Sequence, residues 1–159
     1  MAVPPFVLAL REHIGHTMLW LPGVTAVVLR EDGTRPRVLL VRRADTGEWT
    51  PVTGIVDPGE EPAVAAAREV LEEADVTVTV QRLASVRVVG PVEYDNGDRS
   101  TYLDLTFRCR WESGDPHPAD GENTDAAWFD LDDLPEMSAS MSARLTSALS
   151  AHGEATFTT

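Results

Sequence analysis

Hydrophobic and polar positions follow two periods along the chain. Spacing of about 3.6 residues predicts three helices, at residues 4–14, 62–74 and 138–150. Runs rich in β-branched and aromatic residues predict strands at residues 18–30, 37–43, 77–89, 100–111 and 125–131. No internal repeat or domain boundary interrupts this order, so residues 1–159 are expected to form a single domain. The pattern is compatible with an α/β or an α+β fold, with a mixed sheet between helices.

Three details of this pattern are specific enough to test. The first strand is expected to be interrupted at Pro22-Gly23, because proline lacks an N–H group for a sheet. The tail from Gly153 is expected to be frayed. In the first helix, one apolar stripe is expected to hold Phe6, Val7, Leu10 and Ile14.

The helix at residues 62–74 has an unusual polar face. On a helical wheel Glu69, Glu72 and Glu73 lie together, with Arg68 at the flank. The opposite, apolar face is expected to hold Ala63, Val64, Ala67, Val70, Leu71 and Ala74. A solvated acidic face is the simplest interpretation.

Two effects disfavour a merely solvated face. Three carboxylates within one turn repel by about 0.2–0.5 kcal/mol per pair. They also lie in the C-terminal half of the helix, where the helix dipole disfavours anions. A divalent cation such as Mg²⁺ or Mn²⁺, which prefers oxygen ligands, would offset this repulsion.

The stretch from Gly54 to Val76 carries a specific spacing. It resembles the Nudix box of the Nudix hydrolases, or MutT-like proteins, G-x5-E-x7-R-E-U-x-E-E-x-G-U, where U is a bulky aliphatic residue. Every defined position matches except the last glycine, which is Asp75. That position follows the helix end, where a left-handed backbone is usual, and Asp tolerates this conformation better than most residues. The departure leaves the chemistry of the box unaffected.

The resemblance implies a Nudix fold, an α/β/α sandwich with a mixed sheet. It also implies a Mg²⁺- or Mn²⁺-dependent hydrolase that cleaves the pyrophosphate bond of a nucleoside diphosphate derivative. ADP-ribose, a nucleotide sugar and a (d)NTP are the candidate substrates. By position in the box, the implied metal ligands are Gly54, Glu60, Glu69, Glu72 and Glu73. Glu72 and Glu73 are also implied to be catalytic, and Arg68 is implied to orient the glutamates by ion pairing.

Outside the box, Glu122 is the best candidate for a further catalytic glutamate, acting as metal ligand or general base. A solvated loop acid is an equally weighted interpretation, and Asp125 is a weaker rival. Arg42 and Arg43 end a strand just before the box, and one of them is expected to grip a substrate phosphate. Because side chains alternate along a strand, only one is expected to face the site. Trp49 is expected either to flank the substrate or to belong to the core.

Composition limits the partners. The formal net charge of -13 argues against nucleic-acid polymers and anionic membranes as partners. It is compatible with a small nucleotide substrate, because a bound metal inverts the local charge. Cys109 is the single cysteine, which excludes an internal disulfide and predicts a cytoplasmic location.

An alternative remains within the same family. A catalytically silent Nudix module would bind a ligand for regulation without turnover. Its expected mark is the loss of box glutamates, and all of them are present here. A homodimer is expected only by analogy with related proteins.

Overall fold

The computed structural model describes residues 3–159, which fold as helices and strands in nearly the predicted order. The elements are α1 (Pro5–Ile14), β1 (Leu19–Arg30), β2 (Arg37–Arg43), β3 (Trp49–Thr50), β4 (Val52–Ile55), α2 (Pro62–Ala74), β5 (Thr77–Glu93), β6 (Arg99–Ser113), β7 (Asn123–Asp130), α3 (Ala139–Leu149) and β8 (Thr156–Phe157). The bounds of α2 are those predicted, because Pro62 suits the first helical turn and Asp75 ends the helix with φ 53°. No helix within residues 3–159 has the length and hydrophobicity needed to cross a membrane.

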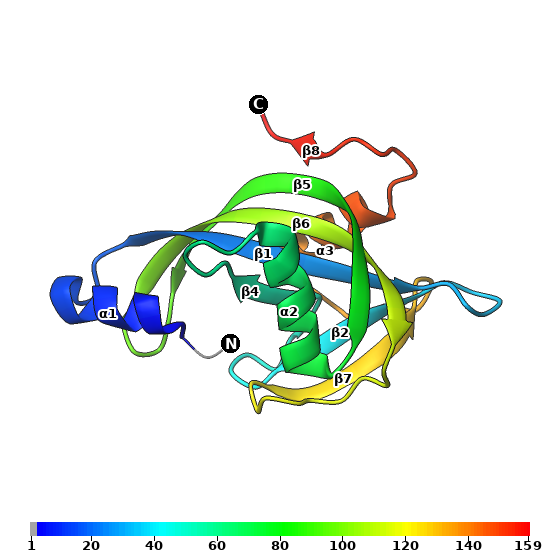
Figure 1. The fold of residues 1–159 in the computed structure, drawn as a ribbon, viewed down its shortest axis with the longest axis horizontal. Helices are drawn as coiled ribbons and strands as arrows, with labels where there is room; N and C mark the ends of the chain where they lie inside the picture. Colours follow the sequence, from blue (N-terminus) through cyan, green and yellow to red (C-terminus); the bar gives the residue numbers. More distant parts are fainter. Residues whose placement is uncertain (1–2) are drawn as a thin grey trace.

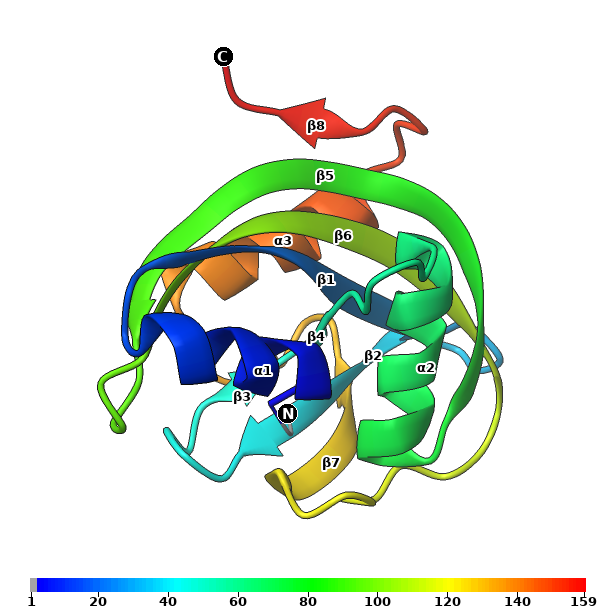
Figure 2. The same cartoon turned by 60° about the vertical axis from the view of Figure 1, so that its left-hand side comes forward.

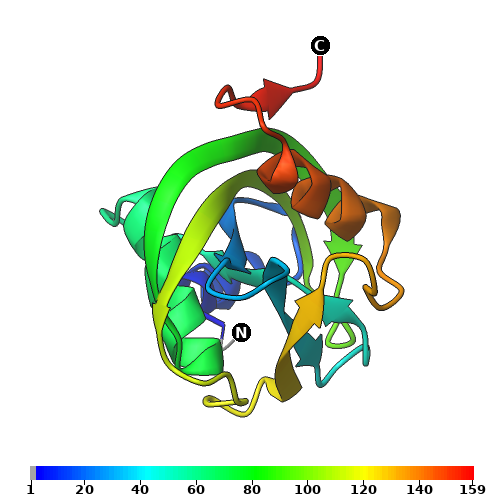
Figure 3. The same ribbon diagram turned by 90° about the vertical axis from the view of Figure 1, so that its right-hand side faces the viewer.

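One mixed sheet joins all the strands, in the order β3-β2-β1-β6-β5-β8, with β4 paired to β1 and β7 paired to β2. β1 runs parallel to β6, whereas β5 and β6 form a long antiparallel pair. The sheet curves strongly, and α2 and α3 lie on opposite sides of it (Figure 1, Figure 3). The expected α/β/α sandwich is therefore confirmed.

Alternation along β1 divides the core between the two faces of the sheet. Val24 and Val28 pack on the α2 side, and Val27 and Leu29 pack on the α3 side with Leu145. Burying both faces explains why β1 reads as a continuous apolar run.

Two predictions about the backbone are wrong, the break in the first strand and the frayed C-terminal tail. β1 continues through Pro22, which keeps its register opposite Leu103 of the parallel strand β6. Proline has no backbone N–H to donate. Pro22 is instead fixed through its carbonyl, which accepts a hydrogen bond from the backbone N–H of Val56 at 3.1 Å. The tail does not fray throughout, because β8 pairs with β5 and places Thr156 opposite Ser85 (Figure 1).

The apolar stripe predicted for α1 is also wrong in part. Val7 is buried against Leu21 and Ile55, but Leu10 and Ile14 are exposed. The helix meets the sheet near one end of β1, so only a narrow part of its surface is covered (Figure 2).

The face that α2 buries differs from the predicted apolar face. Val64 and Leu71 are exposed, whereas Glu69 and Glu73 are buried. The remaining buried residues of the helix are Ala65, Ala66, Val70 and Ala74. Hydrophobicity alone does not set the rotation of α2, because two carboxylates occupy positions that a core helix would fill with apolar side chains.

Candidate functional site

Arg68 joins three glutamates of the acidic stretch. Its Nε donates to Glu60 Oε1 at 2.8 Å and its Nη2 to Glu60 Oε2 at 3.0 Å. Its Nη1 donates to Glu69 Oε1 and to Glu72 Oε2, each at 3.0 Å. Arg68 is thus ion-paired with all three of these side chains, and its guanidinium offsets part of their mutual repulsion.

Glu69 lies directly beside Gly54. A Cβ atom added to Gly54 would lie 2.1 Å from Glu69 Cδ, so only glycine leaves room for the carboxylate. Burial raises the pKa of Glu69, and the neighbouring guanidinium of Arg68 only partly opposes this rise. The carboxylate of Glu69 therefore packs against the backbone of Gly54 and is mostly shielded from water.

Glu73, one helical turn after Glu69 on α2, is also buried, and 4% of the residue is exposed. Its Oε2 accepts a hydrogen bond from Asn123 Nδ2 at 2.9 Å. Burial raises the pKa of Glu73 to about 7, and the charges of Glu69 and Asp120 act in the same direction. Two neighbouring carboxylates that disfavour each other's charge form the central feature of the site.

A cavity of about 400 Å³ opens beside the glutamates. Its polar lining comes from Arg68 and five acids, which are Asp57, Glu69, Glu72, Asp120 and Glu122. Glu122 reaches the acidic cluster although it is far from the box in sequence, and the N–H of Ala44 donates to its carbonyl at 3.0 Å. Glu60 and Glu73 do not line this cavity, although Arg68, which does, is ion-paired with Glu60.

Sequence reasoning missed two residues of the site, Asn123 and Asp120. The first bonds Glu73 and the second lines the cavity. The loop at residues 112–124 is rich in polar, proline and glycine residues, and the pairing of β7 with β2 brings its end to α2. No local spacing signals such a contact.

The two arginines at the end of β2 face different sides of the sheet. Arg43 pairs in register with Asn123, the residue that bonds Glu73, and its guanidinium is ion-paired with Asp45. Arg42 is exposed and lies opposite Trp49 on one side and Asp125 on the other. Arg43 is therefore the arginine on the side of α2.

Trp49 lies away from the acidic cavity. Its ring packs edge-on against Phe129, with 4.8 Å between centroids, within the core on the α3 side. It lines a separate hollow with Met137 at the start of α3. This placement favours the core interpretation of Trp49, and Asp125 lies away from the acidic cavity too, opposite Arg42.

The donor set suits a hard divalent cation. Across residues 3–159, no three acidic, histidine or cysteine side chains already stand in a metal-binding arrangement. The buried pair of Glu69 and Glu73 nevertheless has more negative charge than Arg68 and the neutral Asn123 compensate. Carboxylate oxygens in excess of nearby positive charge are the ligands that Mg²⁺ and Mn²⁺ prefer. The residues therefore fit the metal implied by the box.

Comparison with known proteins decides the family. The NUDIX domain model matches residues 20–149. The chain belongs to the Nudix family. It is 37% identical over 132 residues to a MutT-like protein of Streptomyces ambofaciens, covering 82% of this chain and 78% of that protein. As a Nudix pyrophosphohydrolase it has its box on β4, α2 and the intervening loop.

Other Nudix proteins share part of the sequence or the fold. Identity to the NAD-capped RNA hydrolase NudC of Pseudomonas syringae is 33% over 127 residues, but the chain spans only 40% of that protein. A MutT Nudix hydrolase from Burkholderia pseudomallei superposes with a TM-score of 0.64 at 25% identity, covering 81% of this chain and 98% of that one. A UDP-X diphosphatase superposes with a TM-score of 0.66 at 20% identity, covering 96% of this chain and 73% of that one, and this likeness shows the fold alone.

Proposed function

We propose that this Nudix protein uses Mg²⁺ or Mn²⁺ to hydrolyse the pyrophosphate bond of a nucleoside diphosphate derivative. The observation that carries the proposal is the buried pair of Glu69 and Glu73 beside an acid-lined cavity. Burying two carboxylates that Arg68 and Asn123 compensate only in part costs stability, and a divalent cation would offset that cost.

The metal would be held by Glu69, Glu72 and Glu73, with the carbonyl of Gly54 and the carboxylate of Glu60 as further ligands. When bound, the cation would neutralise diphosphate oxygens and lower the pKa of a water molecule. The protein's own contribution is to hold these carboxylates in place, and Arg68 does this through three of them.

Two side chains outside the box complete the proposal. Glu122 lines the cavity and is the proposed base that accepts the proton of the attacking water. Arg43 lies on the α2 side, and its guanidinium has a planar donor fork that suits two phosphate oxygens. It would exchange its ion pair with Asp45 for the substrate. Arg42 and Trp49 face away from the cavity and are not assigned to the substrate.

Names of similar proteins indicate the substrate class. They include an NAD-capped RNA hydrolase, an ADP-ribose pyrophosphatase of Streptococcus suis and a UDP-X diphosphatase. Each name points to a diphosphate that links a nucleoside to a second group. The formal charge of -13 favours a free small nucleotide over an RNA or membrane surface for this chain. A cytoplasmic location and a homodimer stay predictions.

The test is release of nucleoside monophosphate from ADP-ribose, UDP-glucose and dGTP, with Mg²⁺ or with EDTA. Glu73→Gln keeps the shape of the side chain and one acceptor oxygen but removes its charge. Turnover should require the metal and be lost in Glu73→Gln, whereas Glu154→Gln, at an exposed tail position, should behave as wild type. Equal turnover in Glu73→Gln would refute the assignment of the metal site, and nucleotide binding without turnover would indicate a silent module.

A further inference from the structure

The first turn of α1 reaches the acidic cavity. Pro4 and Pro5 line the same cavity as Glu69 and Glu122, and Ile55 is the third apolar contributor. Figures 1 and 2 show α1 and α2 apart, with β4 drawn between them, and the cavity is lined by residues of both helices. The family match begins at residue 20, so α1 precedes the part that this chain shares with the family model. An element outside that shared part therefore bounds the site.

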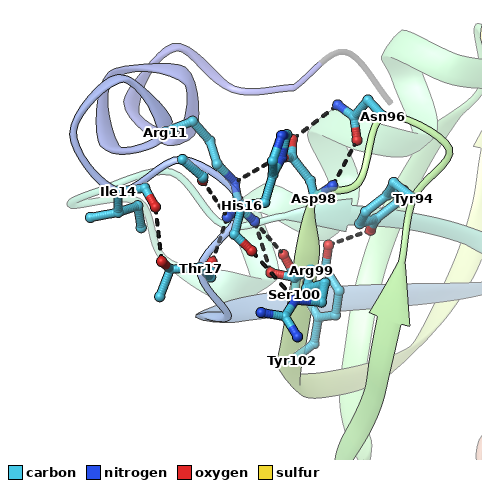
Figure 4. A network of polar contacts seen from close by, with 11 residues as sticks. Arg11, Ile14, His16, Thr17, Tyr94, Asn96, Asp98, Arg99, Ser100 and Tyr102 are labelled. Atoms are coloured by element: carbon cyan, nitrogen blue, oxygen red, sulfur yellow. Dashed lines mark hydrogen bonds and ion pairs between the residues drawn. The ribbon is translucent and has the colours of Figure 1, made fainter.

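The side chain of Arg11 bonds α1 to the β5–β6 hairpin. Arg11 Nη2 donates to the carbonyl of Arg99 at 2.8 Å and to Ser100 Oγ at 3.3 Å. Its Nε lies 3.4 Å from Asp98 Oδ1, and the Arg11 side chain is 10% exposed. Figure 4 shows these contacts converging from α1 onto the β5–β6 hairpin, where His16 also bonds Asp98.

Hydrophobic packing accounts for the position of α1 only in part. Val7 is its one buried apolar side chain, whereas Leu8, Leu10 and Ile14 are each more than a third exposed. A helix held mainly by burial would turn more of these side chains inward. The polar contacts of Arg11 and the packing of Val7 on Leu21 and Ile55 together hold α1, and with it Pro4 and Pro5, at the cavity.

The lining of the cavity is divided by charge. Its acidic side repels any phosphate that a metal does not neutralise, and Arg68 is already engaged with glutamates. Its apolar side is formed by the side chains of Pro4, Pro5 and Ile55, which carry no charge and no hydrogen-bonding group. This surface favours an uncharged part of the substrate, because an anion there would lose water and find no side-chain partner.

We propose that Pro4 and Pro5 form a specificity wall, which contacts the uncharged base or sugar attached to the diphosphate. This inference rests on the proposed function, because it assigns the wall to the same substrate. It makes α1 a determinant of substrate affinity, and leaves the chemical step to the glutamates.

The experiment changes the size and the charge of the wall separately. Pro5→Trp fills space beside the cavity, and should raise KM for ADP-ribose and UDP-glucose about tenfold while kcat stays within twofold. Leu8→Trp adds the same bulk at an exposed position of α1 that does not line the cavity, and should leave KM unchanged. An unchanged KM in Pro5→Trp, or a fall in kcat without a rise in KM, would overturn the proposal.

A matched pair tests the charge of the contacting group. Pro5→Gln and Pro5→Glu differ only in charge, so their KM values should agree within twofold if the neighbouring group is neutral. A KM at least fivefold higher in Pro5→Glu than in Pro5→Gln would place an anionic group at the wall and contradict the proposal. Both variants are compatible with the first helical turn.

Two further measurements separate this inference from the proposed function. Arg11→Gln should raise KM and increase hydrogen exchange in residues 5–14, because it removes the contacts to Arg99 and Asp98. If no substrate is turned over with Mg²⁺, the proposed function fails, and the wall is tested by calorimetric binding of α,β-methylene-ADP with Mg²⁺. The Pro5→Trp substitution should then raise Kd about tenfold, and an unchanged Kd would reject the wall on its own.

Discussion

Two arginine–carboxylate networks lie on opposite faces of the same sheet. On the α3 side, Arg144 lies 3.5 Å from Asp104, and both side chains are 5% exposed. Thr25 and Thr106 donate to the two oxygens of Asp104 at 2.7 and 2.8 Å. On the α2 side, Arg68 is ion-paired with three glutamates and borders an open cavity.

The difference between them is the balance of charge. Asp104 has one cation and two hydroxyl donors, so its charge is balanced by partners within the protein. We call such a charge-balanced network closed. Burial lowers the pKa of Arg144, and the charge of Asp104 opposes that effect. The Arg68 network instead has more carboxylates than cations, and Glu73 beside it has only a neutral partner. A closed network stabilises the fold, whereas an open one with excess charge can bind a cation.

The sharpest test of this comparison is Glu69→Gln. We expect kcat to fall about 10³-fold, or about 4 kcal/mol, because the variant loses a metal ligand beside the cavity. The thermal midpoint of the metal-free protein should not fall, because the substitution removes a buried charge from a repelling pair. Calorimetry in EDTA and steady-state kinetics in Mg²⁺ measure the two effects. A less stable variant that keeps full activity would assign Glu69 a structural role.

The opposite pattern is expected for Asp104→Asn. This variant leaves the buried guanidinium of Arg144 without an anion, and should lower the free energy of unfolding by about 3 kcal/mol. Activity per folded molecule should be retained, because the residue lies on the face away from α2. Urea unfolding and an active-site titration below the transition measure both quantities. If stability is unchanged, the closed network does not support the fold as described.

The sequence predicted the parts of this comparison that depend on local chemistry. The ends of α2 follow from Pro62 and from the left-handed Asp75, and the link from Arg68 to Glu72 follows from their i, i+4 spacing. The central strands follow from their apolar runs. These features need only residues close together in the chain, so composition and period are sufficient.

The parts that were mispredicted depend on contacts between distant segments. The wheel placed Val64 and Leu71 inward, but the approach of Gly54 and Asn123 rotates Glu69 and Glu73 into the protein. Likewise, the exposed side chains of α1 reflect a polar anchor on a distant hairpin, which amphipathic spacing does not encode. The second network escaped notice because Thr25, Asp104 and Arg144 show no motif in the sequence.

Arg68→Gln tests the excess negative charge with a smaller expected loss of activity than Glu69→Gln. It removes the ion pairs to Glu60, Glu69 and Glu72 but leaves every proposed metal ligand in place. We expect kcat/KM to fall about 10–100-fold, as is usual when a residue that orients metal ligands is lost. Higher Mg²⁺ should recover part of the loss, and a magnesium titration of activity measures this. Arg35→Gln, at an exposed pair with Asp132, is the matched control. Activity unaffected by Arg68→Gln would show that the glutamates are held by packing alone.

The smallest expected effect is the pH dependence of the α1 anchor. The hydrogen bond from His16, assisted by Asn96 and Arg11, lowers the pKa of Asp98 below its usual value. A carboxyl group whose folded-state pKa is lowered contributes stability above its unfolded pKa of about 4, and this contribution is lost as the pH falls through the folded value. The difference in unfolding midpoint between wild type and Asp98→Asn should therefore shrink as the pH falls below about 4. Denaturant titrations across that range measure it, and hydrogen exchange of α1 should rise over the same interval. A difference that grows as the pH falls below about 4 would show that Asp98 does not control the anchor.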